Sequence, residues 1–390
     1  MADSRFLQWP FFEAKHRELH ARVDDFAVRE LGYLTDAATE ASGEIDKAVR
    51  RTVRALGQAG LLAHAVAFNA DEVPDVRSIC IAREVLARCH GLADFAFAMQ
   101  GLGSGPISLF GSAQQRERYI AGVAKGDLVA AFALSEAGAG SDVAALQTRA
   151  TLSGDGWRLS GQKTWISNAG IADFYVVFAR SDEGVGHRGI SAFIVDANTP
   201  GLTVRERPEI VAPHPIGTLE LTECRVGEDC LVGERGKGFA IAMATLDVFR
   251  TTVGAAALGF ARCALDAAVS HTRARPMFGA QLSDLQIVRA KLADMELDVE
   301  AAALLIYRAA WTKDRLGGRV SREASMAKLF STEAAQRVVD ECVQLHGGRG
   351  VVKGSIPERL YRDVRALRIY EGASEVQKMI IAGQLLQGAA

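Results

Sequence analysis

Apolar residues recur at helical spacing in two stretches of the chain, from about residue 10 to 125 and from about 236 onward. Spacing of three and four residues places them on one face of an amphipathic helix. One long series in the second stretch predicts a helix that packs in a bundle. Its apolar positions are Leu285, Val288, Leu292, Met295, Val299, Ala302 and Ile306.

Between these stretches, from about 128 to 233, the pattern changes to short apolar runs separated by glycine, proline and aspartate turns. Several runs are rich in the β-branched and aromatic residues that strands favour. Because no helical pattern lies between them, they predict an antiparallel sandwich or barrel. The runs lie at 128–134, 174–178, 190–195 and 218–222.

This order predicts a mixed α and β fold. We expect an N-terminal α-helical domain at 1–127, a middle β-barrel or sandwich domain at 128–234 and a C-terminal α-helical bundle at 235–390. Near the end of the chain, Gly347-Gly348 predicts the end of a helix. The segment Ser374-Glu-Val-Gln377 has the pattern of a capping box that starts the last helix.

Composition excludes several classes of protein. The 390 residues include 45 Lys and Arg against 47 Asp and Glu, a formal net charge of −2, which argues against a nucleic-acid platform or a basic membrane-surface protein. The first 30 residues lack the apolar core of a signal peptide, and no run of about 18 uncharged apolar residues occurs. The six cysteines have neither Cys-x-x-Cys nor zinc-site spacing. We therefore expect a cytoplasmic protein with reduced thiols, no metal site and no membrane span.

Two segments of the middle stretch combine small, hydroxyl-bearing and aromatic residues. The loop Ser135-Glu-Ala-Gly-Ala-Gly-Ser-Asp142 follows an apolar run, and its small residues let backbone N–H groups approach a ligand. Taken alone, the segment is better interpreted as a tight loop. Lys163-Thr-Trp-Ile-Ser-Asn168 ends one strand before another begins, and Trp165 is either a core residue or a flat wall for an aromatic cofactor.

Four charged residues of the last stretch are candidates for chemistry. Arg275, between two long helices, is a phosphate ligand or an exposed loop arginine. Asp247 and Arg250, three residues apart on an apolar helix, form an ion pair or contact a ligand along that helix. Glu371 has apolar and aromatic neighbours that can desolvate its carboxylate and raise its pKa toward that of a base. The alternative is a solvated glutamate at a helix end.

In this order and spacing the motifs resemble those of the flavin-dependent acyl-CoA dehydrogenase family. The resemblance is most specific at 132–142 taken with 163–167, at 344–348 and at 361–372. It implies an α-helical domain, a β-barrel-like middle domain and a four-helix C-terminal bundle. It also implies FAD as cofactor, acyl-CoA as substrate and electron-transferring flavoprotein as electron acceptor. The implied assembly is a homotetramer, a dimer of dimers, with FAD at subunit interfaces.

The resemblance also implies roles for individual residues, with Glu371 as the catalytic base. Those around the flavin ring would be Phe132, Leu134, Ser135, Ser141, Trp165, Ile166 and Ser167. Those for the rest of FAD, including the FAD of a neighbouring subunit, would be Arg275, Phe278, Gln286, Gln344, Gly347, Gly348, Ala373 and Glu375. Those at the acyl-CoA would be Ser141, Asp247, Arg250 and Gly372.

In that family the base removes the α proton of the thioester, and the β-hydrogen leaves as hydride to flavin, giving a trans-2-enoyl-CoA. Some members carry the base on the long helix, where this chain has Phe249, so the base is assigned to Glu371. Members that act on dicarboxylyl-CoA carry an arginine in the stretch equivalent to 91–100, and this chain has none there.

Two loops depart from the usual family sequence, at 65–76 and 207–217. They either alter the choice of acyl chain or change only packing. Two alternative functions share the fold. One is an acyl-CoA oxidase, which would pass electrons to oxygen. The other is a non-catalytic flavoprotein associated with nucleic acid, against which the net charge and the presence of Glu371 both argue.

Overall fold

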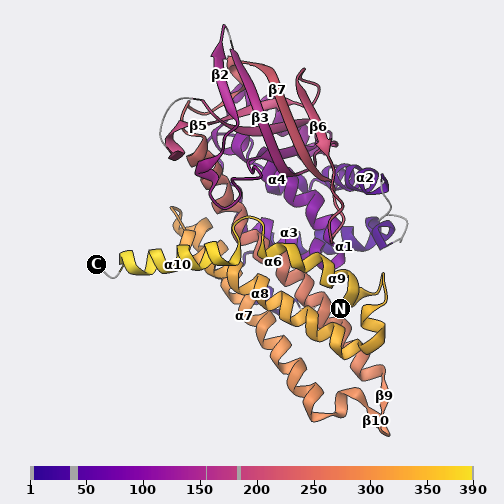
Figure 1. Cartoon of the computed structure of the whole chain (residues 1–390). Helices are drawn as coiled ribbons and strands as arrows, with labels where there is room; N and C mark the ends of the chain where they lie inside the picture. The colour runs from indigo at the N-terminus through magenta and orange to yellow at the C-terminus, as the bar shows by residue number, and fades with distance from the viewer. Residues whose placement is uncertain (1–3, 36–42, 155, 182–185, 389–390) are drawn as a thin grey trace. The chain divides into compact units, whose positions relative to one another are not determined.

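The structure, a computed structural model, describes residues 4–35, 43–154, 156–181 and 186–388. The chain forms two compact units, each assembled from segments that are distant in the sequence. The first, here called the helical unit, comprises Met1–Ala37, Asp75–Asp94 and Asp247–Ala390; the second, the sheet unit, comprises Ala38–Pro74 and Phe95–Leu246. Figure 1 labels the main elements of each unit.

One large sheet runs through the sheet unit. Its strand order is β6-β7-β3-β2-β4-β5-β8, with β1 paired to β4 beside this path. The strands are β1 (Ala130–Ala133), β2 (Arg149–Ser153), β3 (Gly156–Ser167), β4 (Phe174–Arg180), β5 (Ile190–Asp196), β6 (Leu202–Glu206), β7 (Ile216–Gly227) and β8 (Leu231–Val232). Most neighbours are antiparallel, as the sequence predicts, but β1 and β2 pair with β4 in parallel. The runs predicted as strands all fall on strands.

The centre of the sheet is covered on both faces. Every residue of β4 from Phe174 to Ala179 is buried, and alternate residues join two different hydrophobic clusters. Val176 packs in a cluster that includes Ile120 of a helix, whereas Val177 packs in one that includes Leu219 of β7. A strand buried on both sides is apolar throughout instead of alternating. The helices of this unit are α2 (Glu44–Gln58), α4 (Gly91–Phe110) from Phe95 onward, α5 (Ala113–Lys125) and the first part of α6 (Gly238–Ala274), up to Leu246.

The helical unit contains the long helices that the three- and four-residue spacing predicts. They are α1 (Ala14–Glu30), α3 (Val76–Cys89), α6 (Gly238–Ala274) from Asp247 onward, α7 (Gln286–Leu316), α8 (Ser321–His346), α9 (Ile356–Arg365) and α10 (Ser374–Gly388). On α7 the predicted apolar positions from Val288 to Ile306 are buried, except for Leu292, which is half-buried. Helices α7 and α8 pack side by side (Figure 1).

Short elements connect these helices and strands. A hairpin of β9 (Pro276–Met277) and β10 (Ala280–Gln281) joins α6 to α7. As predicted, α8 ends at His346, and Gly347 follows with φ of +58°. The 3₁₀ turns are η1 (Arg5–Gln8), η2 (Gly32–Thr35), η4 (Leu62–Ala65), η5 (Val143–Ala145), η6 (Gly186–Gly189), η7 (Glu228–Cys230), η8 (Leu282–Asp284), η9 (Gly347–Val351) and η10 (Ala366–Arg368).

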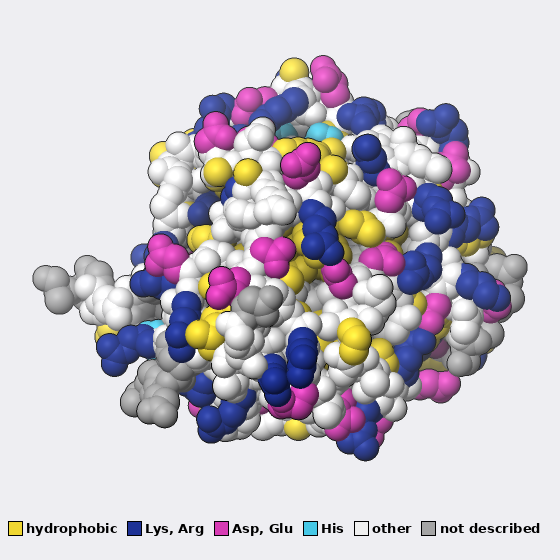
Figure 2. All heavy atoms as spheres, turned by 90° about the horizontal axis from the view of Figure 1, so that it is seen from above, with side chains coloured by type: hydrophobic (Ala, Val, Ile, Leu, Met, Phe, Trp, Pro, Cys, Tyr) yellow, Lys and Arg dark blue, Asp and Glu magenta, His cyan; other side chains and the backbone are white. Residues whose placement is uncertain are grey.

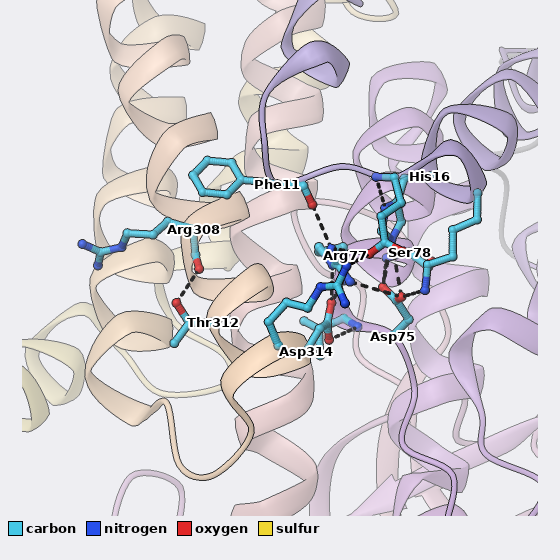
Figure 3. Close-up of polar contacts among 12 residues, drawn as sticks. Phe11, His16, Asp75, Arg77, Ser78, Arg308, Thr312 and Asp314 are labelled. Atoms are coloured by element: carbon cyan, nitrogen blue, oxygen red, sulfur yellow. Dashed lines mark hydrogen bonds and ion pairs between the residues drawn. The ribbon is translucent and has the colours of Figure 1, made fainter.

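A buried polar network fixes the start of α3 within the helical unit (Figure 3). Asp75 is the N-cap of α3, and the carboxylate of Asp314 on α7 accepts hydrogen bonds from the backbone N–H groups of Val76 and Arg77 at 2.8 and 3.1 Å. The Arg77 guanidinium donates to Asp314 at 2.8 Å and to the carbonyl of Phe11 at 2.9 Å. The carboxylates at this N-terminus therefore accept hydrogen bonds from backbone N–H groups that have no partner within the helix, and they interact favourably with the positive end of the helix dipole.

Within the described residues, one helix is long and apolar enough to cross a membrane, by length and composition alone. It is α6, and 78% of its 18-residue apolar window is buried inside the protein. A helix that is apolar on all sides and covered by protein is a core helix.

Charge is mixed on the surface that Figure 2 shows. Lysine and arginine side chains lie interspersed with aspartate and glutamate over this face, and the described residues form no broad band of one sign there. This distribution agrees with the near balance of 45 basic and 47 acidic residues in the sequence.

Candidate active site

A β-bulge in β3 presents Trp165 to solvent. The pairing of β3 with β7 shifts between Lys163 and Ile166, so Trp165 occupies the irregular part of the strand with φ of +58°. Its side chain is 59% exposed. A bulky residue in the left-handed region costs about 1–2 kcal/mol and persists only where its surroundings enforce it. The core alternative for Trp165 is therefore excluded, and the flat indole is displayed at the surface of the sheet unit.

A buried ion pair joins this bulge to the loop that follows β1. Lys163 is fully buried, and its Nζ donates to the carbonyl of Leu134 at 3.0 Å and to Glu136 Oε1 at 2.8 Å. Burial lowers the pKa of Lys163 to about 8, against the attraction of Glu136. Burial would raise the pKa of Glu136, but Lys163 and hydrogen bonds from Thr148 hold it below its usual value.

The bulge and the loop bring several predicted flavin-site residues together. The backbone N–H of Thr164, within the bulge, donates to the carbonyl of Ser135 at 3.0 Å. Ser135 and Ser167 are half-buried, whereas Ser141 lies on the exposed end of the loop. The other predicted members of this set are Phe132, Leu134 and Ile166. Phe132, in β1, is half-buried, and the centroid of its ring lies 4.9 Å from that of Phe178. Leu134 and Ile166 are buried.

This corner of the sheet unit suits a flat aromatic group. The exposed indole of Trp165 offers a stacking face, and the hydroxyls of Ser135 and Ser167 lie on segments joined to it. In the loop, a Cβ added at Gly138 or Gly140 would meet nothing within 4 Å, so the backbone there is open to a ligand. The residues present therefore fit the isoalloxazine of FAD.

In the helical unit, Glu371 lies in a strained turn between η10 and α10. Glu371 has φ of +52° and the next residue, Gly372, has φ of +93°. Glu371 is half-buried, and its Oε2 is completely buried without a hydrogen-bond partner among the residues described. Burial raises the pKa of Glu371, while the positive charges of Arg83, Lys328 and Arg250 oppose that rise. The solvated-glutamate alternative does not hold for this carboxylate.

The turn is held by side chains from α8 and α10. Lys328 Nζ donates to the carbonyl of Gly372 at 2.8 Å, and Gln377 Nε2 donates to the same oxygen at 2.9 Å and to the carbonyl of Glu371 at 3.3 Å. A Cβ at Gly372 would lie 2.3 Å from Gln377 Nε2. Position 372 therefore favours glycine for its φ, and a Cβ there would displace the Gln377 amide from the turn.

The predicted capping box at the start of α10 does not form. The helix does begin at Ser374, but the Ser374 hydroxyl donates to Glu333 Oε1 on α8 at 2.6 Å. The backbone N–H of Gln377 donates to the carbonyl of Ala373, and its side chain is occupied by the turn. Tertiary partners have replaced the local ones, because both side chains serve to anchor the Glu371 turn.

A second charge cluster lies beside Glu371 and was not found from the sequence. Arg83 on α3 is buried and forms a bidentate pair with Asp94, at 2.7 and 2.8 Å, while its third nitrogen donates to Thr252 at 2.9 Å. Among the positive charges that oppose the rise in the pKa of Glu371, Arg83 has the largest effect. The only local signal was an arginine within a helical apolar pattern, which is usually a surface residue.

Asp247 and Arg250 form the intrahelical ion pair that the spacing allows. Arg250 Nη1 lies 3.0 Å from Asp247 Oδ1, and Ser321 on α8 donates to the other oxygen at 3.3 Å. Arg250 is buried, and its Nε has no hydrogen-bond partner within the described ranges. An unpaired buried donor of this kind is costly, so it marks a place where a ligand oxygen is welcome.

Most of the residues predicted to bind the outer part of FAD are exposed, and two of them, Ala373 and Glu375, lie beside the Glu371 turn. Phe278 is at the tip of the β9–β10 hairpin, 89% exposed, with φ of +51°, and Gly279 follows at +79°. Figure 1 shows this hairpin well away from α10. The other exposed members are Arg275, Gln286, Gln344, Gly347 and Gly348. Ala373 and Glu375 flank the start of α10, half-buried and exposed.

All six cysteines are free thiols. Among the described residues no group of three or more His, Cys, Asp or Glu is arranged to hold a metal ion.

Models of all three acyl-CoA dehydrogenase domains match the chain. The N-terminal domain matches residues 13–127, the middle domain 131–224 and the C-terminal domain 236–386. Together these ranges take in most of the chain.

Comparisons with individual proteins agree with these domain matches. The chain is 40% identical over 379 residues to the mitochondrial short-chain specific acyl-CoA dehydrogenase of Bos taurus, covering 95% of this chain and 90% of the relative. It is 35% identical over 380 residues to the caffeyl-CoA reductase–Etf complex subunit CarC of Acetobacterium woodii, covering 97% and 100%. The structure matches that of the acyl-CoA dehydrogenase complexed with FAD from Bacillus anthracis with a TM-score of 0.89 and 30% identity, covering 100% of this chain and 71% of that one. The chain therefore belongs to the acyl-CoA dehydrogenase family of FAD-dependent oxidoreductases and has its three-domain fold.

Proposed function

We propose that this enzyme converts an acyl-CoA thioester to the trans-2-enoyl-CoA, with Glu371 as the base that removes the α proton. The observation that carries the proposal is the Glu371 carboxylate, whose Oε2 is buried without a partner and whose pKa is raised by that burial. A base is most effective when its pKa approaches the working pH, which a solvated glutamate does not achieve. Family membership supplies the reaction class.

The residues around Trp165 are proposed to hold the flavin ring, and Ser141, Asp247, Arg250 and Gly372 to contact the acyl-CoA. Bound FAD supplies the acceptor for the hydride that leaves the β carbon. The buried Arg250 Nε, without a partner in the part of the chain described, is a donor available to the substrate. Removal of an α proton develops charge on the thioester oxygen, and fixed donors are the efficient way to stabilise it.

The assembly and electron acceptor are proposed by the same reasoning. A relative of this chain is a subunit of an Etf complex, which supports electron-transferring flavoprotein as acceptor. Exposed Phe278 and the exposed apolar residues of α10, Met379 and Leu386, support burial against other subunits in a homotetramer. We also propose cytoplasmic localisation and domains at 1–127, 128–234 and 235–390.

The base assignment is tested by Glu371→Gln, which keeps the shape of the side chain but cannot accept the proton. Under anaerobic conditions, acyl-CoA should bleach wild-type flavin, and the variant should do so at least about 1,000-fold more slowly while retaining FAD. Glu296→Gln, an exposed glutamate on α7, is the matched control and should behave as wild type. Normal bleaching by Glu371→Gln would remove Glu371 as the base.

The acyl group is tested with a panel of straight, branched, cyclic and aryl acyl-CoA substrates. The relatives' names include a short-chain specific dehydrogenase and a caffeyl-CoA reductase, so short straight chains and aryl-propanoyl chains are the first to compare. The rate of flavin reduction ranks them. Rapid peroxide formation without an added acceptor would instead identify an acyl-CoA oxidase.

A further inference from the structure

The backbone conformation of the turn that carries Glu371 is stabilised by side chains from outside the turn. Both Glu371 and Gly372 have positive φ, and a non-glycine residue in that region is disfavoured unless its surroundings fix it. The two carbonyls of the turn accept hydrogen bonds from the side chains of Lys328 and Gln377. The direction in which the Glu371 carboxylate points therefore depends on residues outside the turn.

Lys328 is the unusual member of this pair. It lies on α8, is fully buried, and its Nζ donates to the carbonyl of Gly372 at 2.8 Å. A buried ammonium is costly unless a charge compensates it, and a neutral glutamine would make the same hydrogen bond at lower cost. In the described part of the chain, the hydrogen bond found for Lys328 goes to this carbonyl and not to a carboxylate. A reason to keep a charge at this position is the nearby Glu371.

A second contact from α8 holds the other end of the same segment. Glu333, five residues after Lys328, accepts a hydrogen bond from the Ser374 hydroxyl at 2.6 Å and pairs with Arg368 at 2.9 Å. One rigid helix therefore contacts the chain at Gly372 and again at Ser374. Such a two-point attachment fixes the orientation of the turn relative to α8.

We propose that Lys328 is a positioning residue for the reaction: it holds the Glu371–Gly372 turn in its left-handed shape and favours the ionised carboxylate that accepts the α proton. The inference rests on the proposed role of Glu371 as base. Lys328 itself touches neither substrate nor flavin in this assignment and acts through the turn.

Electrostatics define the pH range in which this arrangement works. Burial raises the pKa of Glu371, with Asp94 adding to the rise and Arg83, Lys328 and Arg250 opposing it. Burial lowers the pKa of Lys328 to about 8, with Arg250 adding to the fall. The acidic groups that act on Lys328 in the opposite direction are Glu371, Glu333 and Glu375. Proton removal is therefore fastest above the pKa of Glu371 and below that of Lys328.

The test compares the pH profile of anaerobic flavin reduction in wild type, Lys328→Met, Lys328→Arg and Lys313→Met. Lys313 on α7 is a matched control, because its exposed Nζ also donates to a glycine carbonyl, that of Gly318, at 2.8 Å. We expect Lys328→Met to reduce flavin up to about 100-fold more slowly at neutral pH. Its acidic limb should move to higher pH, and its alkaline limb near pH 8 should disappear. The dissociation constant for acyl-CoA should change little.

Lys328→Arg should restore part of the rate and also lack the limb near pH 8, because an arginine stays protonated. Flavin absorbance and thermal unfolding show whether each variant is folded; if Lys328→Met is not, the profile of Lys328→Arg decides. Infrared difference spectra of the Glu371 carboxyl give a readout independent of turnover, and the carboxyl band should titrate at higher pH in Lys328→Met.

Two outcomes separate this inference from the proposed function. If Glu371→Gln is inactive but both Lys328 variants keep the wild-type limbs, Lys328 is only structural and the inference is wrong. If Glu371→Gln bleaches flavin normally, the base assignment fails and the role of Lys328 fails with it. A Lys313→Met profile altered in the same way as Lys328→Met would also overturn the inference.

Discussion

Two strained segments, one in each unit, are each held by a buried lysine. In the sheet unit, Lys163 lies two residues before Trp165, which has φ of +58°, and its ammonium group donates to the backbone carbonyl of Leu134. In the helical unit, Lys328 donates to the carbonyl of Gly372, beside Glu371 at +52°. Burial lowers the pKa of both lysines to about 8. Local conditions of the two ammonium groups are therefore closely similar.

The difference is in what balances their charge. Lys163 also donates to the carboxylate of Glu136 at 2.8 Å, so a hydrogen-bonded ion pair is complete within the sheet unit. Lys328 hydrogen-bonds a peptide carbonyl, and its charge acts on Glu371 through space. Two equally buried lysines can therefore have different roles. Lys163, neutralised by Glu136, only fixes the conformation of the backbone. Lys328, which has no hydrogen-bonded carboxylate, also changes the protonation of Glu371.

The largest stability effect is expected for Lys163→Met. It leaves the partly buried Glu136 without its cation, and breaking a buried pair in this way costs about 3 kcal/mol. Denaturant unfolding should show this loss, accompanied by reduced FAD content, because the loop after β1 loses its attachment to β3. Lys237→Met, at an exposed lysine of the same unit, is the control. A loss as small as that of the control would mean that the ion pair is not what fixes the loop.

The contribution of Lys328 to stability should depend on pH. Its folded pKa of about 8 lies below the ordinary value of 10.5, so the unfolded chain binds more protons between these two values. Wild type should therefore gain stability relative to Lys328→Met as pH rises from 8 to 10.5, by on the order of 2 kcal/mol. Thermal unfolding at several pH values measures the difference. A difference that stays flat with pH would contradict a buried, charged Lys328.

The smallest effect is expected for Trp165→Gly. Glycine relieves the left-handed strain, which is worth about 1 kcal/mol, while little packing is lost from a side chain that is 59% exposed. The variant should be as stable as wild type or slightly more so without cofactor, yet retain less FAD on dialysis. Glu223→Gly provides the control, since Glu223 on β7 also has positive φ, +49°. Full FAD retention by Trp165→Gly would exclude the indole as a flavin contact.

Features that depend on local spacing could be predicted from the sequence. The apolar series along α7 and the β-branched run at 174–178 each occupy the expected element, because periodicity reports burial on one face or two. The end of α8 at Gly347 followed from the freedom of glycine to adopt positive φ. Motif resemblance added the three-domain fold and FAD, which the family matches confirm.

Features that depend on distant partners could not be predicted. Glu136 and Lys163 are 27 residues apart, and Arg83 meets Thr252 across 169 residues, so no local pattern marks either pair. The capping box at Ser374 failed for the same reason, since Glu333 competes for its hydroxyl from another helix. The positive φ of Trp165 contradicts local preference altogether, so no local rule predicts it.

The carboxylate of Asp314 at the start of α3 has a consequence for synthesis. Its partners Val76 and Arg77 leave the ribosome more than 230 residues earlier, so at first the start of α3 has only its local N-cap, Asp75, and gains these two hydrogen bonds later. The sheet unit ends at Leu246, whereas the helical unit needs segments from both ends of the chain. Contacts this distant in sequence form late, because loop closure precedes any gain from them. We therefore expect the sheet unit to mature first on the nascent chain, and the Glu371 turn to be assembled later, once the segments that follow Leu246 have been synthesised.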